Sequence, residues 1–285
     1  MYKEHIIIGY GAWAKKIINF LIKNKLFKKI IVVRQKKQFI IYPNYKLINK
    51  KELKKIYSRN STGHICSDNK THYKYFKLFT KLKKKFIIEK PLINSKNDLK
   101  KISKIKNKKK ILVNYIDLFN SNLIKIKKIL NKNKKKIIKI QIIYTSKNQK
   151  YKKKSLLINE WLDHPLSIIL YLFNKFPKFK LIKFERSYIK KKNLYETVEL
   201  EYKLKNITIN ILISNKIKKQ RLIIVKINSK KYFFNLNNHK NKNSKSSFFN
   251  LYKNLMKFNK SKFVFDFSFH KKIFNEKIKL NKKIN

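Results

Sequence analysis

The chain has 285 residues, enough for one large domain or two ordinary ones, and an apolar fraction of 43% that excludes a disordered protein. Its net charge of +61 would suit a nucleic-acid partner, but only four of the 75 basic residues are arginines, which base-reading proteins favour. Because the lysines are spread over every segment, we attribute the charge to the codon usage of an AT-rich genome and expect no nucleic-acid partner.

The first elements form a strand, a glycine turn, a helix and a second strand. The apolar run at residues 6–8 predicts a buried strand, and a second run at residues 30–33 predicts its neighbour. Between them, a helix is expected to bury one stripe, made of Ala14, Ile17, Ile18 and Leu21. The turn reads Gly9-Tyr10-Gly11-Ala12-Trp13-Ala14, a Gly-x-Gly-x-x-Ala pattern typical of dinucleotide-binding proteins.

The composition makes this turn more specific than the pattern alone. The chain has three glycines and two alanines, and two of the glycines and both alanines fall within these six positions. The first glycine would allow the tight turn, and the second would let the backbone approach a pyrophosphate at the helix N-terminus. An ordinary strand-to-helix turn is the competing interpretation.

Arg34 follows the second strand, where an acidic residue would bind the ribose 2′-hydroxyl of NAD. An arginine can instead accommodate the 2′-phosphate of NADP. We therefore expect an NAD(P) cofactor, with NADP favoured.

Strands and helices continue to alternate up to residue 118. Strands are expected within residues 42–56, at 63–66, 86–88 and 111–113, and helices within 42–56, near 70–82 and at 98–106. Asp68 or Asn69 can cap the second of these helices. This alternation predicts an α/β domain over residues 1–118 with a doubly wound, mostly parallel sheet of the Rossmann type.

Two further motifs follow strands of this domain: Ser67-Asp68-Asn69-Lys70-Thr71-His72, and Glu89-Lys90-Pro91-Leu92. Together with the glycine turn, the chain resembles the glucose–fructose oxidoreductase / inositol dehydrogenase / MocA family. The resemblance implies that the Lys90–Pro91 bond is cis and that Lys90 points at the nicotinamide and the substrate. It also implies a set of cofactor-binding residues: Gly9, Tyr10, Gly11, Ala12, Trp13, Arg34, Ser67, Asp68, Asn69, His72, Glu89 and Lys90. A purely structural role for His72 is an equal alternative.

The pattern changes beyond residue 118. Alternating apolar residues predict strands at 137–144, 181–188, 198–204, 207–213, 222–227 and 232–236. Helices are expected at 123–130, 159–173, 248–258 and 269–278. We therefore expect residues 119–285 to form an α/β substrate-binding domain with a large, open, mostly antiparallel sheet. The resemblance implies a homo-oligomer formed through this sheet.

The catalytic residues of this second domain are expected in the segment Glu160-Trp161-Leu162-Asp163-His164. Glu160 and His164 share one helix face at i and i+4, and Asp163 is an alternative partner for the histidine. The resemblance implies that His164 relays a proton from a substrate hydroxyl while the nicotinamide takes a hydride. Asp117 and Pro165 depart from the family pattern.

The remaining features bound the location of the protein. The single cysteine, Cys66, excludes a disulfide within the chain, and the histidines show no metal-ligand spacing. Apolar runs such as 166–173 are too short for a membrane span, and no signal peptide is visible. We expect a cytoplasmic protein without a membrane partner.

The function expected is hydride transfer between NAD(P) and a hydroxyl or keto carbon of a sugar, nucleotide-sugar or cyclitol-like substrate. Lys90, His164 and Glu160 or Asp163 would be catalytic. The alternative is a catalytically inactive homologue of the same fold that binds nucleotide as a sensor or subunit.

Overall fold

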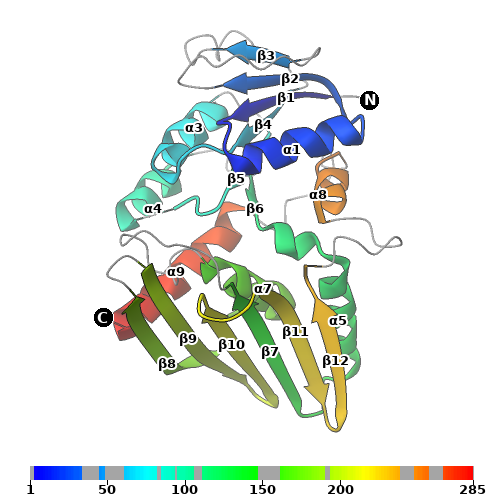
Figure 1. Cartoon of the computed structure of the whole chain (residues 1–285), viewed down its shortest axis with the longest axis vertical. Coiled ribbons are helices and arrows are strands. Elements are labelled where there is room, and N and C mark those ends of the chain that lie inside the picture. Colours follow the sequence, from blue (N-terminus) through cyan, green and yellow to red (C-terminus); the bar gives the residue numbers. More distant parts are fainter. Residues whose placement is uncertain are drawn as a thin grey trace. The chain divides into compact units, whose positions relative to one another are not determined.

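The computed structural model describes residues 3–33, 45–48, 61–81, 85–93, 95–105, 111–146, 161–189, 193–237, 247–256 and 266–284. The chain divides into two compact units (Figure 1). Unit 1 comprises residues 1–114 and 258–271, and unit 2 comprises residues 115–257 and 272–285. The sequence placed the boundary after residue 118 and did not anticipate the return of a C-terminal segment to the first unit.

Unit 1 is built on a six-stranded parallel sheet with the order β3-β2-β1-β4-β5-β6. Its strands are β1 (Lys3–Ile8), β2 (Phe27–Val33), β3 (Tyr45–Ile48), β4 (Ser61–Ile65), β5 (Phe86–Glu89) and β6 (Ile111–Asn114). This order reverses direction between β1 and β4, as in dinucleotide-binding Rossmann folds. The predicted doubly wound parallel sheet is therefore confirmed.

Helices α1 (Ala12–Lys23), α3 (Asn69–Lys81) and α4 (Lys96–Ser103) connect these strands (Figure 1). The predicted stripe of α1 is confirmed, because all four of its residues are buried. Helix α4 begins at a serine cap: the Ser95 hydroxyl accepts a hydrogen bond from the Asp98 N–H.

A pair of histidines lies inside the parallel sheet. His5 on β1 and His64 on β4 are both buried, and Nδ1 of His5 lies 2.9 Å from Nε2 of His64. Burial, followed by the neighbouring His5, holds the pKa of His64 well below its usual value. We therefore expect the His64 ring to be neutral.

The first turn of the C-terminal helix α9 (Phe267–Ile284) belongs to unit 1. Buried His270 accepts a hydrogen bond at Nε2 from the Ile93 N–H, at 3.2 Å. This bond ties the segment that follows Pro91 to a residue near the end of the chain.

Unit 2 is built on a second six-stranded sheet with the order β12-β11-β7-β10-β9-β8 (Figure 1). The strands are β7 (Ile138–Thr145), β8 (Lys178–Ile189), β9 (Asn193–Leu204), β10 (Ile207–Ser214), β11 (Gln220–Ile227) and β12 (Lys230–Asn235). Only β7 and β10 pair in parallel, so the predicted, mostly antiparallel sheet is confirmed.

The helical elements of unit 2 are η2 (Ile116–Phe119), α5 (Ser121–Lys132), α7 (Asp163–Phe173), α8 (Ser247–Met256) and most of α9. Pro165 is the third residue of α7, where a missing N–H costs no intrahelical hydrogen bond. It is therefore compatible with the start of a helix and does not kink its interior. No helix among the described residues is long and apolar enough to cross a membrane.

Candidate functional site

Three loops meet at the carboxyl edge of the parallel sheet in unit 1, because they follow the neighbouring strands β1, β4 and β5. The Gly9 N–H donates to the Val33 carbonyl at 3.0 Å, and the Cys66 N–H donates to the Ile8 carbonyl at 2.9 Å. Ligands of open parallel sheets bind at this edge, where the strand order reverses. The structure thus brings the glycine turn, the Ser67–His72 motif and the Glu89–Leu92 motif to one side of the sheet.

Gly9 is required by the fold itself. Its φ angle is +97°, which side-chain-bearing residues rarely adopt, and a Cβ atom would lie 2.8 Å from the Cys66 carbonyl oxygen. The turn can therefore pass this close to β4 only with glycine at this position.

Gly11 differs from Gly9, because no contact with a described part of the protein requires a glycine at this position. Its φ angle is −71°, and a Cβ atom there would meet no described protein atom within 4 Å. Gly11 also caps α1, whose first N–H groups lack intrahelical partners and attract anions. Space kept open at a helix N-terminus fits a closely approaching phosphate, so these residues suit a dinucleotide.

The second motif begins α3 and is held by local hydrogen bonds. The Ser67 and Thr71 hydroxyls lie 2.7 Å apart, and the Asp68 carboxylate accepts a bond from the Lys70 N–H at 3.0 Å. Asp68 is thus the residue that supports the helix start, as the sequence had suggested for Asp68 or Asn69.

His72 joins this motif to the next one. It is fully buried, with Nδ1 2.9 Å from the Pro91 carbonyl oxygen and Nε2 3.0 Å from the Ser67 carbonyl oxygen. Burial lowers the pKa of His72, and the two carbonyl groups oppose that shift. The side chain therefore fixes two loops, in keeping with the structural alternative that the sequence left open.

The third motif carries the cis Lys90–Pro91 bond that the resemblance implied. Glu89 ends β5, where its carboxylate accepts a hydrogen bond from the Asn114 side chain at 2.6 Å. Desolvation raises the pKa of Glu89 to about 8, although Asn114, Lys90 and Trp13 oppose the shift. The half-buried Lys90 therefore lies beside a carboxyl group that is mostly protonated at neutral pH.

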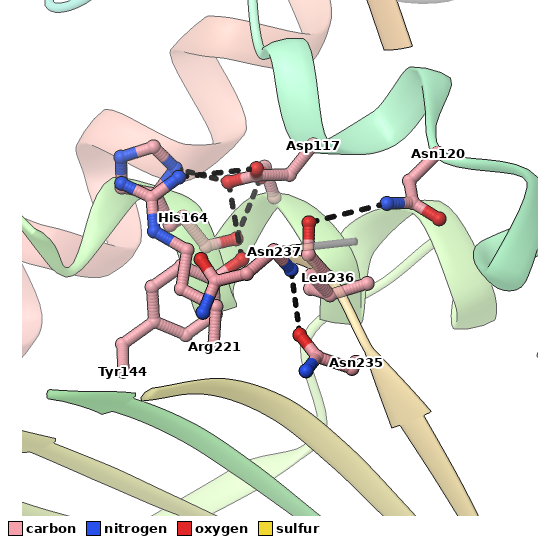
Figure 2. Close-up of polar contacts among 9 residues, drawn as sticks. Asp117, Asn120, Tyr144, His164, Arg221, Asn235, Leu236 and Asn237 are labelled. Atoms are coloured by element: carbon pink, nitrogen blue, oxygen red, sulfur yellow. Dashed lines mark hydrogen bonds and ion pairs between the residues drawn. The ribbon is translucent and has the colours of Figure 1, made fainter. Parts of the chain in front are cut away.

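In unit 2, Asp117 of η2 lies at the centre of a polar cluster (Figure 2). Its Oδ2 atom is 2.5 Å from Nδ1 of His164 and accepts a hydrogen bond from the Tyr144 hydroxyl at 3.0 Å. Its Oδ1 atom lies 3.6 Å from the Arg221 guanidinium. Burial favours a raised pKa, but His164, Arg221 and Tyr144 together hold the pKa of Asp117 below its usual range.

This arrangement fixes the chemistry of His164. An ionised carboxylate at Nδ1 keeps the proton on that nitrogen, so Nε2 is the atom that exchanges a proton. The Tyr144 ring stacks on the imidazole, with centroids 5.4 Å apart and planes 18° apart. His164 is thus oriented by a hydrogen bond and by an aromatic face.

Asn120 holds the loop that carries Asp117 (Figure 2). Its side chain caps α5 by accepting a bond from the Asn122 N–H, and it donates to the Leu236 carbonyl at 3.3 Å. Its own N–H donates to the Asp117 carbonyl at 3.0 Å. The C-terminal end of the short η2 helix is therefore fixed within unit 2.

The structure adds an acidic partner for His164 that the sequence did not suggest. The sequence offered Glu160 or Asp163; among the described residues, the carboxylate of Asp117, which had counted as a departure from the family pattern, binds His164. Asp163 instead forms a buried ion pair with Lys277 at 2.8 Å. Glu160 and Arg34 lie outside the described residues, so their expected roles stay predictions. Within the described ranges, no three histidine, cysteine or acidic side chains are grouped to hold a metal ion.

The sequence matches no protein-family model and no curated protein. Solved structures share its fold. The myo-inositol dehydrogenase from Corynebacterium glutamicum has a TM-score of 0.78 at 9% identity, over 98% of this chain and 95% of that one. The dehydrogenase MviM from Clostridium difficile has a TM-score of 0.75 at 17% identity, over 99% and 100%. A dehydrogenase from Chromobacterium violaceum has a TM-score of 0.70 at 9% identity, over 96% and 94%. The family resemblance of the motifs is therefore confirmed at the level of architecture: this chain has the two-domain fold of the glucose–fructose oxidoreductase / inositol dehydrogenase / MocA oxidoreductases.

Proposed function

We propose that the protein is an NAD(P)-dependent oxidoreductase of this family, acting on a hydroxyl or keto carbon of a sugar, nucleotide-sugar or cyclitol-like substrate. The observation that carries the proposal is the open space at Gly11, at the N-terminus of α1 and next to the two other motif loops. When bound there, the nicotinamide supplies or accepts the hydride.

The residues of unit 1 bind and orient. The N–H groups at the start of α1 would hold the pyrophosphate, and the Ser67 loop would border the nicotinamide ribose. His72 would keep that loop and the Lys90 turn in register through its two carbonyl contacts. Lys90 would orient the substrate oxygen and stabilise negative charge that develops on it.

The residues of unit 2 move the proton. Nε2 of His164 would take the hydroxyl proton during oxidation and return it during reduction. Asp117 would hold the imidazole in the required tautomer and stabilise its protonated form. The contact of Asp117 with His164 supports an active enzyme over an inactive homologue. Asp117 departs from the family pattern, but in this position it would serve catalysis.

The test is a fluorescence titration of the purified chain with NADPH and with NADH. We expect saturable binding of both, tighter for NADPH because of Arg34. No binding of either would sink the proposal, and tighter binding of NADH would remove only the role of Arg34. Turnover of a hydroxylated substrate should then be lost in Lys90→Ala and in His164→Ala while NADPH binding persists; full activity of both variants would refute the catalytic assignment.

A further inference from the structure

Arg221 is the second residue of β11 and contributes a cation to the cluster around His164 (Figure 2). Its guanidinium lies 3.6 Å from Oδ1 of Asp117, a distance too long for a hydrogen bond. The guanidinium carbon also lies 5.8 Å from the centroid of the Tyr144 ring, the ring that stacks on His164. Arg221 and His164 therefore share the same two neighbours.

Within the part of the chain that the structure describes, the donors of Arg221 are largely unused. A guanidinium has five N–H donors, and the one polar contact of this side chain with the described residues is the ion pair with Asp117. About a third of the side chain, 34%, is exposed, so solutes have access to it. A residue whose sole task was to keep Asp117 ionised would be expected to donate a hydrogen bond to it.

The choice of arginine is also informative in this chain. Four of the 75 basic residues are arginines, so the position departs from the general use of lysine. A planar guanidinium can donate two parallel bonds to a carboxylate or phosphate, which an ammonium group cannot.

The charge of the cluster points the same way. With His164 neutral, Asp117 and Arg221 cancel, and a proton on His164 leaves a net charge of +1. An anionic group held at Arg221 would offset that charge at the step in which His164 accepts the proton.

We propose that Arg221 binds an anionic group of the substrate, a carboxylate or a phosphate, and so selects acidic or phosphorylated hydroxy compounds over neutral ones. This inference rests on the proposed function for its meaning, but its test does not need turnover. Arg186 provides a matched control: it lies in the same unit, its side chain is 33% exposed, and it forms an ion pair with Glu196 at 3.0 Å.

The test is an NMR titration that follows the Nε–Hε signals of the arginines, which number only four. The signal missing from Arg221→Lys assigns Arg221, and Arg186→Lys assigns the control. The probes are D-glucose, D-glucuronate and D-glucose 6-phosphate, which differ only in the group at C6. The titrations are run with and without NADPH.

We expect glucuronate, glucose 6-phosphate or both to shift the Arg221 signal saturably, while glucose leaves it unchanged. Affinity for the acting anion should fall at least about tenfold in Arg221→Lys and stay unchanged in Arg186→Lys, because an ionic hydrogen bond is lost. A shift with glucuronate would indicate a carboxylate substrate, and a shift with glucose 6-phosphate would indicate a phosphorylated one.

Three results would overturn the proposal: no probe shifts Arg221, glucose shifts it as strongly, or the Arg186 signal responds equally, as for general attraction to a +61 chain. A protein that binds NADPH but shows one of these results keeps the proposed function and loses the anion site. A protein that binds the anions at Arg221 but neither cofactor loses the proposed function alone.

Discussion

The carboxylate of Asp117 and the imidazole of His164 lie 2.5 Å apart although 47 positions separate them in the chain. The contact joins the short η2 helix to the first turn of α7, and Tyr144 of β7 braces both side chains. Three elements of unit 2 thus converge on one oxygen atom, Oδ2 of Asp117.

Replacing Asp117 should therefore damage chemistry more than binding. For Asp117→Asn we expect kcat to fall by about 10²-fold or more, since the amide cannot stabilise the protonated imidazole. The measurement is steady-state kinetics across pH, with NADPH affinity unchanged. Asp163→Asn is the matched control because its carboxylate pairs with Lys277; a larger loss of kcat in the control would show that the wrong acid has been assigned.

Replacing the two turn glycines with alanine should have different effects, one on stability and the other on cofactor binding. Gly9→Ala forces a side chain into a positive φ angle and against the Cys66 carbonyl, so we expect a loss of stability of about 1–3 kcal/mol. Gly11→Ala meets no described protein atom within 4 Å, so its unfolding midpoint should barely change while NADPH binding weakens at least about tenfold. Urea unfolding and fluorescence titration measure the two effects. Unweakened cofactor binding by Gly11→Ala would contradict the role of the open space.

Acid should destabilise the parallel sheet through His64. The pKa of His64 is lowered in the folded state, so below the unfolded value near 6.5 the unfolded chain binds the extra proton. The stability of the neutral form is present above pH 6.5 and is lost as pH falls, by up to about 1.4 kcal/mol per pH unit. Urea midpoints from pH 7 to 5 should fall less steeply in His64→Gln than in the wild-type chain. Parallel curves would refute this assignment.

Glu89 should give stability the opposite pH dependence: a rise in pH, and not a fall, should destabilise the protein through this group. Its pKa is raised to about 8, so between its unfolded value and pH 8 the folded chain binds the extra proton. Its stabilising contribution is complete below pH 4.5 and is lost as pH rises through 8. Glu89→Gln resembles the protonated acid, so its stability relative to wild type should increase between pH 6 and 9. A constant difference between the two proteins over that range would show that Glu89 is ionised throughout.

Local patterns predicted the fold well. The apolar runs of β1, β2 and β5 and the stripe of α1 depend on near neighbours in sequence, and all are buried as expected. The concentration of small residues in the Gly9–Ala14 turn gave the cofactor hypothesis a local signal too. These features could be predicted from the sequence because the geometry of the backbone sets the period and spacing of their residues.

The site in unit 2 was less accessible to sequence reasoning. Spacing along one helix favoured Glu160, which lies outside the described residues, and did not indicate that the Asp117 carboxylate, 47 positions away in the chain, binds His164. The repeating apolar pattern of one helix or strand gives no information about a contact between segments so far apart in the sequence. The same limit concealed the contact of His72 with the Pro91 carbonyl, which lies 19 positions away.

The hydrogen bond between Ile93 and His270 spans 177 positions. A ribosome makes the chain from its N-terminus, so the six strands of the parallel sheet are synthesised long before the residue that completes their unit. The hydrogen bond of Ile93 cannot form, and unit 1 cannot be completed, until residues 266–271 leave the exit tunnel. A nascent chain stalled before that segment should therefore be more open to protease near Ile93 than the released protein.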